Sequence, residues 1–77
     1  MADEQTRQLV RMVNQIALNL GEQRDLGSAV VQTEDHLRRF WTPDMRGQLV
    51  AYWQSDGSEL SPAAAAVAEQ LAGQLPA

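Results

Sequence analysis

The sequence predicts an all-α protein, a small bundle of about four short helices. Three observations predict this class. Apolar residues recur every three or four positions in successive segments, prolines and glycines separate these segments, and no segment shows the two-residue alternation of a strand. A chain of 77 residues fits one domain, here residues 1–77. The helices are expected at about residues 4–20, 26–41, 43–54 and 62–74.

The first expected helix, residues 4–20, has one apolar stripe. Spacings of three and four residues place side chains on the same face of a helix. The stripe consists of Leu9, Met12, Val13, Ile16, Ala17 and Leu20. Gly21 follows the last of these residues and is typical of a helix C-terminus.

The second expected helix, residues 26–41, has a less certain beginning and a clear end. Its apolar face consists of Leu26, Val30, Thr33, Leu37, Phe40 and Trp41. Ser28 is the candidate N-cap, although Gly27 before it leaves the first helical residue open. Pro43 disfavours helical geometry at Thr42, so we expect the helix to end near Trp41.

The third expected helix, residues 43–54, begins with a strong start signal. Thr42 can cap it, Pro43 suits the first helical position, and a negative charge at Asp44 matches the positive end of the helix dipole. Its apolar side consists of Met45, Leu49, Tyr52 and Trp53.

The fourth expected helix, residues 62–74, repeats this signal with Ser61 and Pro62 after a polar turn at residues 55–58. Four consecutive alanines, residues 63–66, give it high intrinsic helix propensity. We expect only a thin apolar edge, formed by Val67, Leu71 and Leu75.

Charge and composition exclude several classes of partner. Ten acidic residues against six arginines give a net charge of −4, which argues against nucleic-acid or anionic-membrane binding, since both need basic patches. No stretch approaches the roughly 20 apolar residues that span a bilayer. The acidic residues Asp3 and Glu4 lie where a secretory signal would be basic and then apolar. We therefore expect a cytoplasmic protein with no membrane partner.

The sequence offers no constellation of catalytic, cofactor-binding or metal-binding residues. There is no cysteine, and His36 is the only histidine, whereas structural zinc normally needs four nitrogen or sulfur ligands. The serines lie at turns and caps, and the five glycines lack nucleotide-binding spacing. We expect no enzymatic activity in the isolated chain. A helix-turn-helix DNA reader is a weaker alternative, for which the third helix offers only Arg46, Gln48 and Gln54.

All four aromatic residues fall between positions 40 and 53. They are Phe40, Trp41, Tyr52 and Trp53. Arginines and a methionine accompany them, and these residue types are enriched at protein interfaces. The alternative is a core corner between the second and third helices. Because so small a core cannot easily bury two tryptophans, we expect Phe40 and one tryptophan inside and the other tryptophan facing outward.

Three motifs resemble the delta subunit of NAD-dependent, molybdenum-containing formate dehydrogenases. The first is Leu-Val-Arg-Met-Val-Asn-Gln-Ile-Ala at residues 9–17, and the second is His-Leu-Arg-Arg-Phe-Trp-Thr-Pro-Asp-Met-Arg at residues 36–46. The third is Gly-x-x-Leu-x-Pro at residues 57–62. They occur in the family's order. Thr42 stands where the family usually has an acid and Asp44 where it has a base, so an ion pair formed there would be lost or reversed.

The resemblance implies a non-catalytic accessory subunit that supports assembly or stability of a complex oxidising formate to carbon dioxide and reducing NAD. Its partners would be the catalytic subunit, which holds molybdenum and iron–sulfur cofactors, and the flavin- and NAD-binding subunits. The delta chain itself holds no cofactor. A transient maturation chaperone for the molybdenum-cofactor subunit is the nearest alternative, and a small DNA-binding regulator is a more distant one.

Candidate partner-binding residues follow from the motifs and the aromatic cluster. The main candidates are Phe40, Trp41, Pro43, Met45, Arg46 and His36. The secondary candidates, on the polar side of the first helix, are Arg11, Asn14 and Gln15.

Overall fold

A computed structural model describes residues 3–74 and confirms the all-α class. It has four helices: α1 (Glu4–Asn19), α2 (Leu26–Phe40), α3 (Pro43–Ser55) and α4 (Pro62–Gln74). No strand occurs in this part of the chain. Each helix end lies within one residue of its predicted position. Leu75, predicted to extend the apolar edge of α4, lies outside the described residues.

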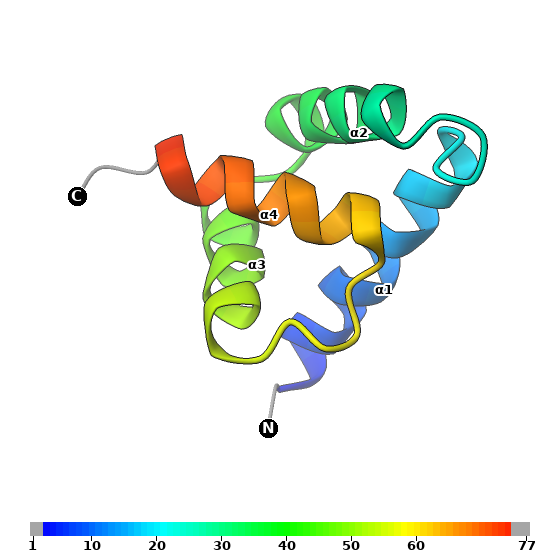
Figure 1. Cartoon of the computed structure of the whole chain (residues 1–77). Coiled ribbons are helices and arrows are strands. Elements are labelled where there is room, and N and C mark those ends of the chain that lie inside the picture. The colour runs from blue at the N-terminus through cyan, green and yellow to red at the C-terminus, as the bar shows by residue number, and fades with distance from the viewer. Residues whose placement is uncertain (1–2, 75–77) are drawn as a thin grey trace.

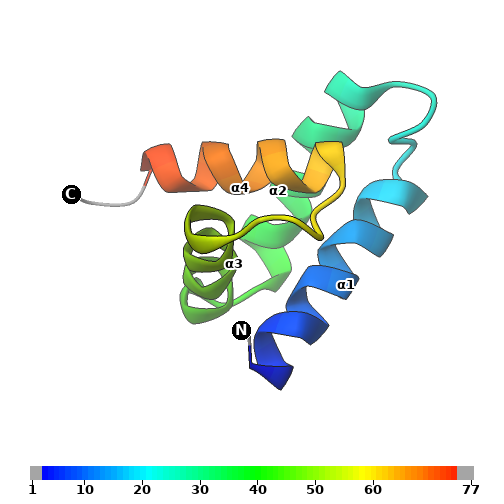
Figure 2. The same ribbon diagram turned by 60° about the horizontal axis from the view of Figure 1, so that its bottom comes forward.

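The helices cross one another around a single core, with α4 lying against both α2 and α3 (Figure 1). The turned view shows α1 running along the opposite side of the bundle from the C-terminal end of α4 (Figure 2). Helix α1 contacts each of the other three helices. The fully buried side chains at the centre come from all four helices, and the largest of them are Val13, Thr33, Leu37, Leu49 and Val67.

Polar side chains fix where all four helices begin. At α4, the Ala64 N–H donates to Ser61 Oγ at 3.2 Å, as the sequence predicted. Asp3, Asp25 and Thr42 are the N-caps of α1, α2 and α3, and each side chain accepts a hydrogen bond from a backbone N–H three residues ahead. The prediction of Ser28 as the cap of α2 is wrong, because Asp25 Oδ1 accepts the Ser28 N–H at 3.1 Å. The helix can therefore begin before Gly27, because the Asp25 carboxylate already accepts the Ser28 N–H, which the first turn of the helix leaves without a partner.

The end of α1 follows the glycine signal. Gly21 has φ of +92°, a backbone conformation that favours glycine. The Gly21 N–H donates to the Leu18 carbonyl at 3.2 Å and the Glu22 N–H donates to the Ala17 carbonyl at 3.1 Å. This pair of bonds is a Schellman motif, which satisfies carbonyls that the helix end leaves free.

Helix α4 buries a broader face than the predicted thin edge. Ala63, Ala64 and Ala68 are fully buried beside Val67 and Leu71. Alanine allows helices to approach closely, so α4 packs into the centre of the bundle and makes its most extensive contact with α2. The alanine run thus has a packing role in addition to its helix propensity.

The prediction for Phe40 is wrong, because its side chain is 70% exposed. Trp41 is only 6% exposed, and Trp53 is partly buried against the core. The reason lies in the end of α2, where Phe40 is the last helical residue and Trp41 adopts extended backbone. The chain turns inward at Trp41, which places the indole in the core and leaves the preceding ring outside.

Candidate functional site

The most exposed large apolar side chain in the described chain, that of Phe40, lies against the ring of His36. The two ring centroids are 4.8 Å apart and the rings are tilted by 45°. They are four residues apart on α2 and therefore lie on one helix face. Both line a shallow hollow of about 220 Å³, whose lining is Leu20, Gln32, Asp35, His36, Arg39 and Phe40. We call these six residues the Phe40 patch.

The Phe40 patch combines an apolar centre with a charged rim. Arg39 Nε lies 3.1 Å from Asp35 Oδ2, and both side chains are largely exposed. Paired rim charges of this kind contribute little to stability. An exposed aromatic ring with a charged rim is typical of a contact surface for another protein.

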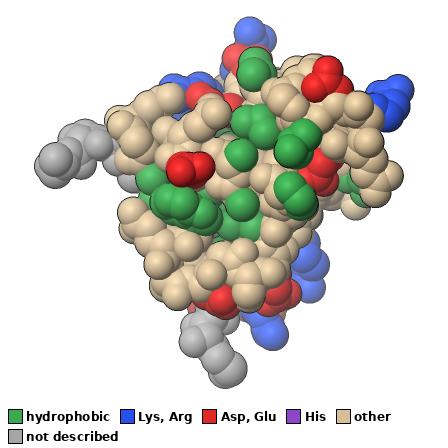
Figure 3. Space-filling view, in the orientation of Figure 1, with side chains coloured by type: hydrophobic (Ala, Val, Ile, Leu, Met, Phe, Trp, Pro, Cys, Tyr) green, Lys and Arg blue, Asp and Glu red, His purple; other side chains and the backbone are tan. Residues whose placement is uncertain are grey.

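The face of the molecule that carries α4 is a different kind of surface. Figure 3 shows apolar side chains gathered over the centre of this face, in the region that α4 occupies in Figure 1. The half-buried apolar residues of α4 are Ala65, Ala66 and Ala72. These small side chains provide no projecting group, so this face offers less to anchor a partner than the Phe40 ring does.

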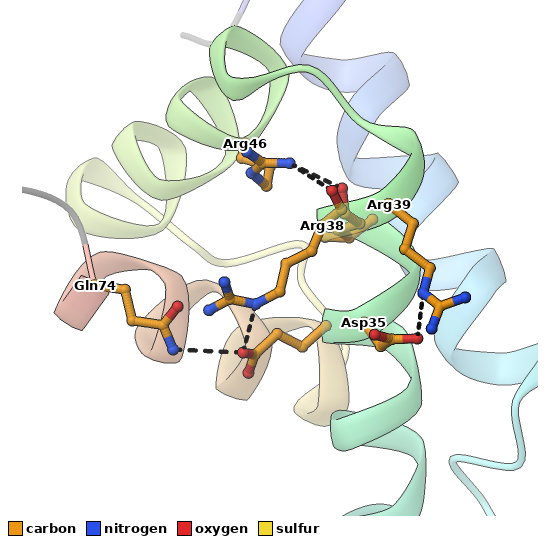
Figure 4. A network of polar contacts seen from close by, with 7 residues as sticks. Asp35, Arg38, Arg39, Arg46 and Gln74 are labelled. Atoms are coloured by element: carbon orange, nitrogen blue, oxygen red, sulfur yellow. Dashed lines mark hydrogen bonds and ion pairs between the residues drawn. The ribbon is translucent and has the colours of Figure 1, made fainter.

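Arg46, a main candidate contact, points back to the end of α2. Its Nη1 donates to the carbonyl of Trp41 at 2.8 Å. The same nitrogen donates to the carbonyls of Leu37 and Arg38 at 3.2 Å each, and Figure 4 shows the Arg46 side chain pointing toward the end of α2. A cation at a helix C-terminus is favourable because the free carbonyls there carry partial negative charge. Arg46 therefore joins α3 to α2 within the fold. If α3 read DNA, this arginine would not be on its outer face to contact the bases.

A second polar link joins α2 to the end of α4. Arg38 Nε lies 2.9 Å from Glu34 Oε2, and Gln74 Nε2 donates to the same oxygen at 3.4 Å (Figure 4). Glu34 is the more buried member of the ion pair, with 15% of its side chain exposed. The ion pair lies within α2, and the Gln74 hydrogen bond is the part of this group that connects α2 with α4.

Asn14 also has a role within the fold. Its Nδ2 donates to the Glu59 carbonyl at 2.8 Å, and its Oδ1 accepts the Ser61 N–H at 2.9 Å. Both hydrogen-bonding ends of the amide are thus engaged with the segment between α3 and α4. The two other candidates on α1 are exposed: Gln15 donates to Asn19, and Arg11 lies near Glu4.

The remaining candidates divide between surface and core. Pro43 is exposed at the first turn of α3, where it restricts the backbone, and Met45 is half-buried and packs against the core. Trp41 lies inside. Of the nine residues predicted to bind a partner, Arg11, Gln15, Phe40 and Pro43 are exposed, and His36 is partly exposed beside Phe40.

The structure also forms a hollow that the sequence analysis missed. It measures about 240 Å³ and is lined by Arg7, Val10, Arg11, Asn14, Tyr52 and Glu59. These residues come from α1, α3 and the segment that follows α3. No sequence signal links them, because only the crossing of α1 and α3 brings positions 45 residues apart together.

Two further findings concern chemistry. Within residues 3–74, no group of three or more histidine, cysteine, aspartate or glutamate side chains is arranged to hold a metal ion. Across the same residues, every helix is too short or too polar to cross a lipid bilayer.

The fold defines a class, that of small all-α proteins whose short helices cross around one core and are joined by polar side-chain links. The family follows from the sequence comparison. The profile of the NADH-dependent formate dehydrogenase delta subunit family, FdsD, matches residues 8–68, and the chain belongs to this family. Comparisons with curated proteins and with solved structures find no significant match.

Proposed function

We propose that this chain is a non-catalytic accessory subunit of a cytoplasmic, NAD-dependent formate dehydrogenase, and that it supports assembly or stability of the complex. The observation that carries the proposal is the family match over residues 8–68. A delta subunit acts in association with other subunits. The proposed partners are the subunit that holds the molybdenum and iron–sulfur cofactors and the subunits that bind flavin and NAD.

The Phe40 patch is the proposed contact with the catalytic subunit. Its central ring is exposed to water, and burying a phenylalanine side chain on association is favourable by about 1.5–3 kcal/mol. His36 supports the ring from one side, so the ring loses less conformational freedom on binding than an isolated side chain would. Trp41, Met45 and Arg46 support this surface from within, because they fix the junction between α2 and α3.

The test compares two apolar-to-serine substitutions on α2. Phe40→Ser removes the centre of the patch. Val31→Ser is the control, because Val31 is also exposed, at 66%, and nine residues of helix place it on the opposite side of α2. We expect Phe40→Ser to weaken association with the catalytic subunit at least tenfold, within the range for interface aromatics, and Val31→Ser to leave it unchanged.

Each result has a separate meaning. Normal association of the Phe40→Ser variant would place the contact elsewhere, with the accessory role intact. Failure of the unmodified chain to associate with any dehydrogenase subunit would overturn the proposed function. Stoichiometric presence in the purified active enzyme is expected for a permanent subunit, whereas a maturation chaperone would be lost once the enzyme is active.

A further inference from the structure

The turn after α3 contains an aspartate that is directly followed by a glycine. Asp56 is the C-cap of α3 and is exposed, and Gly57 has a φ of +71°. A Cβ at position 57 would lie 3.2 Å from the Trp53 carbonyl oxygen, so this turn favours glycine. The carboxyl of Asp56 is therefore next to a backbone nitrogen whose own residue has no side chain to shield it.

The Gly57 nitrogen is not held by a hydrogen bond. Among residues 3–74, the Gly57 N–H has no acceptor, whereas the Asp56 N–H donates to the Tyr52 carbonyl at 2.9 Å. The Ser58 N–H donates to Asp56 Oδ1 at 3.3 Å, which holds the carboxyl toward the backbone that follows it. A reaction between this carboxyl and the Gly57 nitrogen thus breaks no backbone hydrogen bond.

The backbone of Asp56 is turned toward closure of a ring with the next nitrogen. Its ψ is −72°. In an L residue, rotation of ψ from the helical value of about −42° to more negative angles moves the next nitrogen toward Cβ. The Gly57 nitrogen and the Asp56 side chain are therefore closer to the same side of the Cα–C bond than they would be in a helix. A five-membered ring through Cγ and this nitrogen needs that arrangement.

We infer that Asp56 is a modification site, at which the folded protein slowly converts aspartate to isoaspartate through a cyclic imide. The Gly57 nitrogen bonds to Asp56 Cγ, and the hydroxyl of the protonated carboxyl leaves with the amide proton as one water. The reaction is intramolecular, so proximity favours it. Water then opens the ring. Addition to the side-chain carbonyl restores aspartate, whereas addition to the main-chain carbonyl breaks its bond to nitrogen and leaves the chain running through Cβ and Cγ.

Isomerisation at Asp56 would act on the contacts that join α1 and α3 to the segment before α4. The Glu59 N–H donates to the Tyr52 hydroxyl at 3.1 Å, and the Glu59 carbonyl accepts from Asn14 Nδ2 at 2.8 Å. Isoaspartate adds one carbon to the backbone between these contacts and the end of α3. The isomerised chain should therefore unfold at a lower temperature than the original. This chemistry is independent of the proposed accessory role.

The experiment incubates the folded, full-length chain at neutral pH in water enriched in heavy oxygen, and locates the label by peptide mass spectrometry. Opening of the ring inserts one solvent oxygen, so the peptide that contains Asp56 should gain label and part of it should become isoaspartate. Asp35 and Asp44 are exposed controls in the same molecule. The amide after Asp35 lies within α2, and the Met45 N–H donates to a side-chain oxygen, so we expect no label at either control.

Two variants test the assignment to Asp56. Asp56→Glu keeps the charge but needs a larger ring, so it should abolish the label in this peptide. Asp44→Glu is the matched control and should leave the label at Asp56 unchanged. Circular dichroism checks that both variants fold.

Three results would contradict the inference. Absence of label at Asp56 in the folded chain, or label only after unfolding in urea, would overturn it. So would equal labelling at Asp35 and Asp44, because the turn after α3 would then confer no selectivity. An isomerised chain that unfolds at the same temperature as the original would overturn the expected effect on the Glu59 contacts.

Discussion

The guanidinium of Arg46 on α3 donates to the backbone carbonyl of Trp41 at 2.8 Å, so a side chain of the neighbouring helix caps the C-terminal end of α2. The same nitrogen also reaches the carbonyls of Leu37 and Arg38. The Leu37 carbonyl also accepts the Trp41 N–H, so Arg46 is most important for the carbonyls of Arg38 and Trp41, and it joins the start of α3 to the end of α2. Phe40 is the last residue of α2, directly before this junction.

Replacing Arg46 with methionine should destabilise the protein by about 2 kcal/mol, since hydrogen bonds from a charged group contribute more than neutral ones. For a chain of this size, the loss corresponds to a fall in Tm of about 10 °C. Thermal unfolding monitored by circular dichroism measures it. Arg39→Met is the control, because its exposed ion pair with Asp35 should contribute less than about 1 kcal/mol. Equal losses in the two variants would contradict the role assigned to the Arg46 bonds.

Local signals predicted the helices well because those signals are physical causes. Thr42 and Pro43 start α3 in the structure as in the sequence, and Gly21 ends α1 through its positive φ. The sites were harder to predict. Phe40 and Trp41 are neighbours with the same apolar character, and only the turn of the backbone at the end of α2 decides which of them is buried.

Asn14 illustrates the other limit of sequence reasoning. A polar residue on a helix is ordinarily solvated or available to a partner, and nothing near it in the sequence indicates otherwise. Its actual partners, Glu59 and Ser61, are 45 and 47 residues away. Such contacts depend on how the helices cross, which apolar periodicity alone does not specify.

Asn14→Asp should destabilise the protein by about 1–3 kcal/mol. The carboxylate keeps an acceptor for the Ser61 N–H but loses the donor to the Glu59 carbonyl, and it places a negative charge beside that oxygen. Urea unfolding of the full-length chain measures the change. Gln15→Glu makes the same chemical substitution one residue later, where the side chain is exposed, and should change stability by less than about 0.5 kcal/mol. Similar effects at both positions would show that Asn14 is not a specific link.

Thr33 and Thr42 should respond in opposite directions to the same substitution. Thr33 is fully buried, and its hydroxyl has no hydrogen-bond partner among the described residues. Thr33→Val should therefore stabilise the protein by about 1 kcal/mol, because it removes an unpaired buried polar group. Thr42 Oγ1 accepts the Met45 N–H at 3.1 Å as the cap of α3, so Thr42→Val should cost about 1 kcal/mol. Unfolding midpoints of the two variants measure both effects. A loss of stability in Thr33→Val would indicate that the hydroxyl has a partner, such as a buried water.

Asp3 should make the stability of α1 depend on pH. The hydrogen bond from the Thr6 backbone N–H, 2.8 Å long, lowers the pKa of the Asp3 carboxyl below its usual value, and the Thr6 side chain lowers it further. Because the folded state binds the proton less tightly than the unfolded state, the contribution of this cap is complete above the unfolded pKa, about 4. It is lost as the pH falls through the lower folded pKa.

Asp3→Ser isolates this contribution, since serine also caps a helix but does not titrate in this range. The difference in unfolding free energy between the original chain and the variant should be constant from pH 5 to pH 7, and should shift in favour of the variant below about pH 4. Titration of the Asp3 side chain by NMR should give a pKa below that of an unstructured aspartate. A stability difference that is independent of pH down to pH 2 would mean that the carboxylate does not hold the Thr6 amide. In that case, the start of α1 would depend on helix propensity and packing alone, and Asp3 would be only a solvated charge near the amino end of the helix.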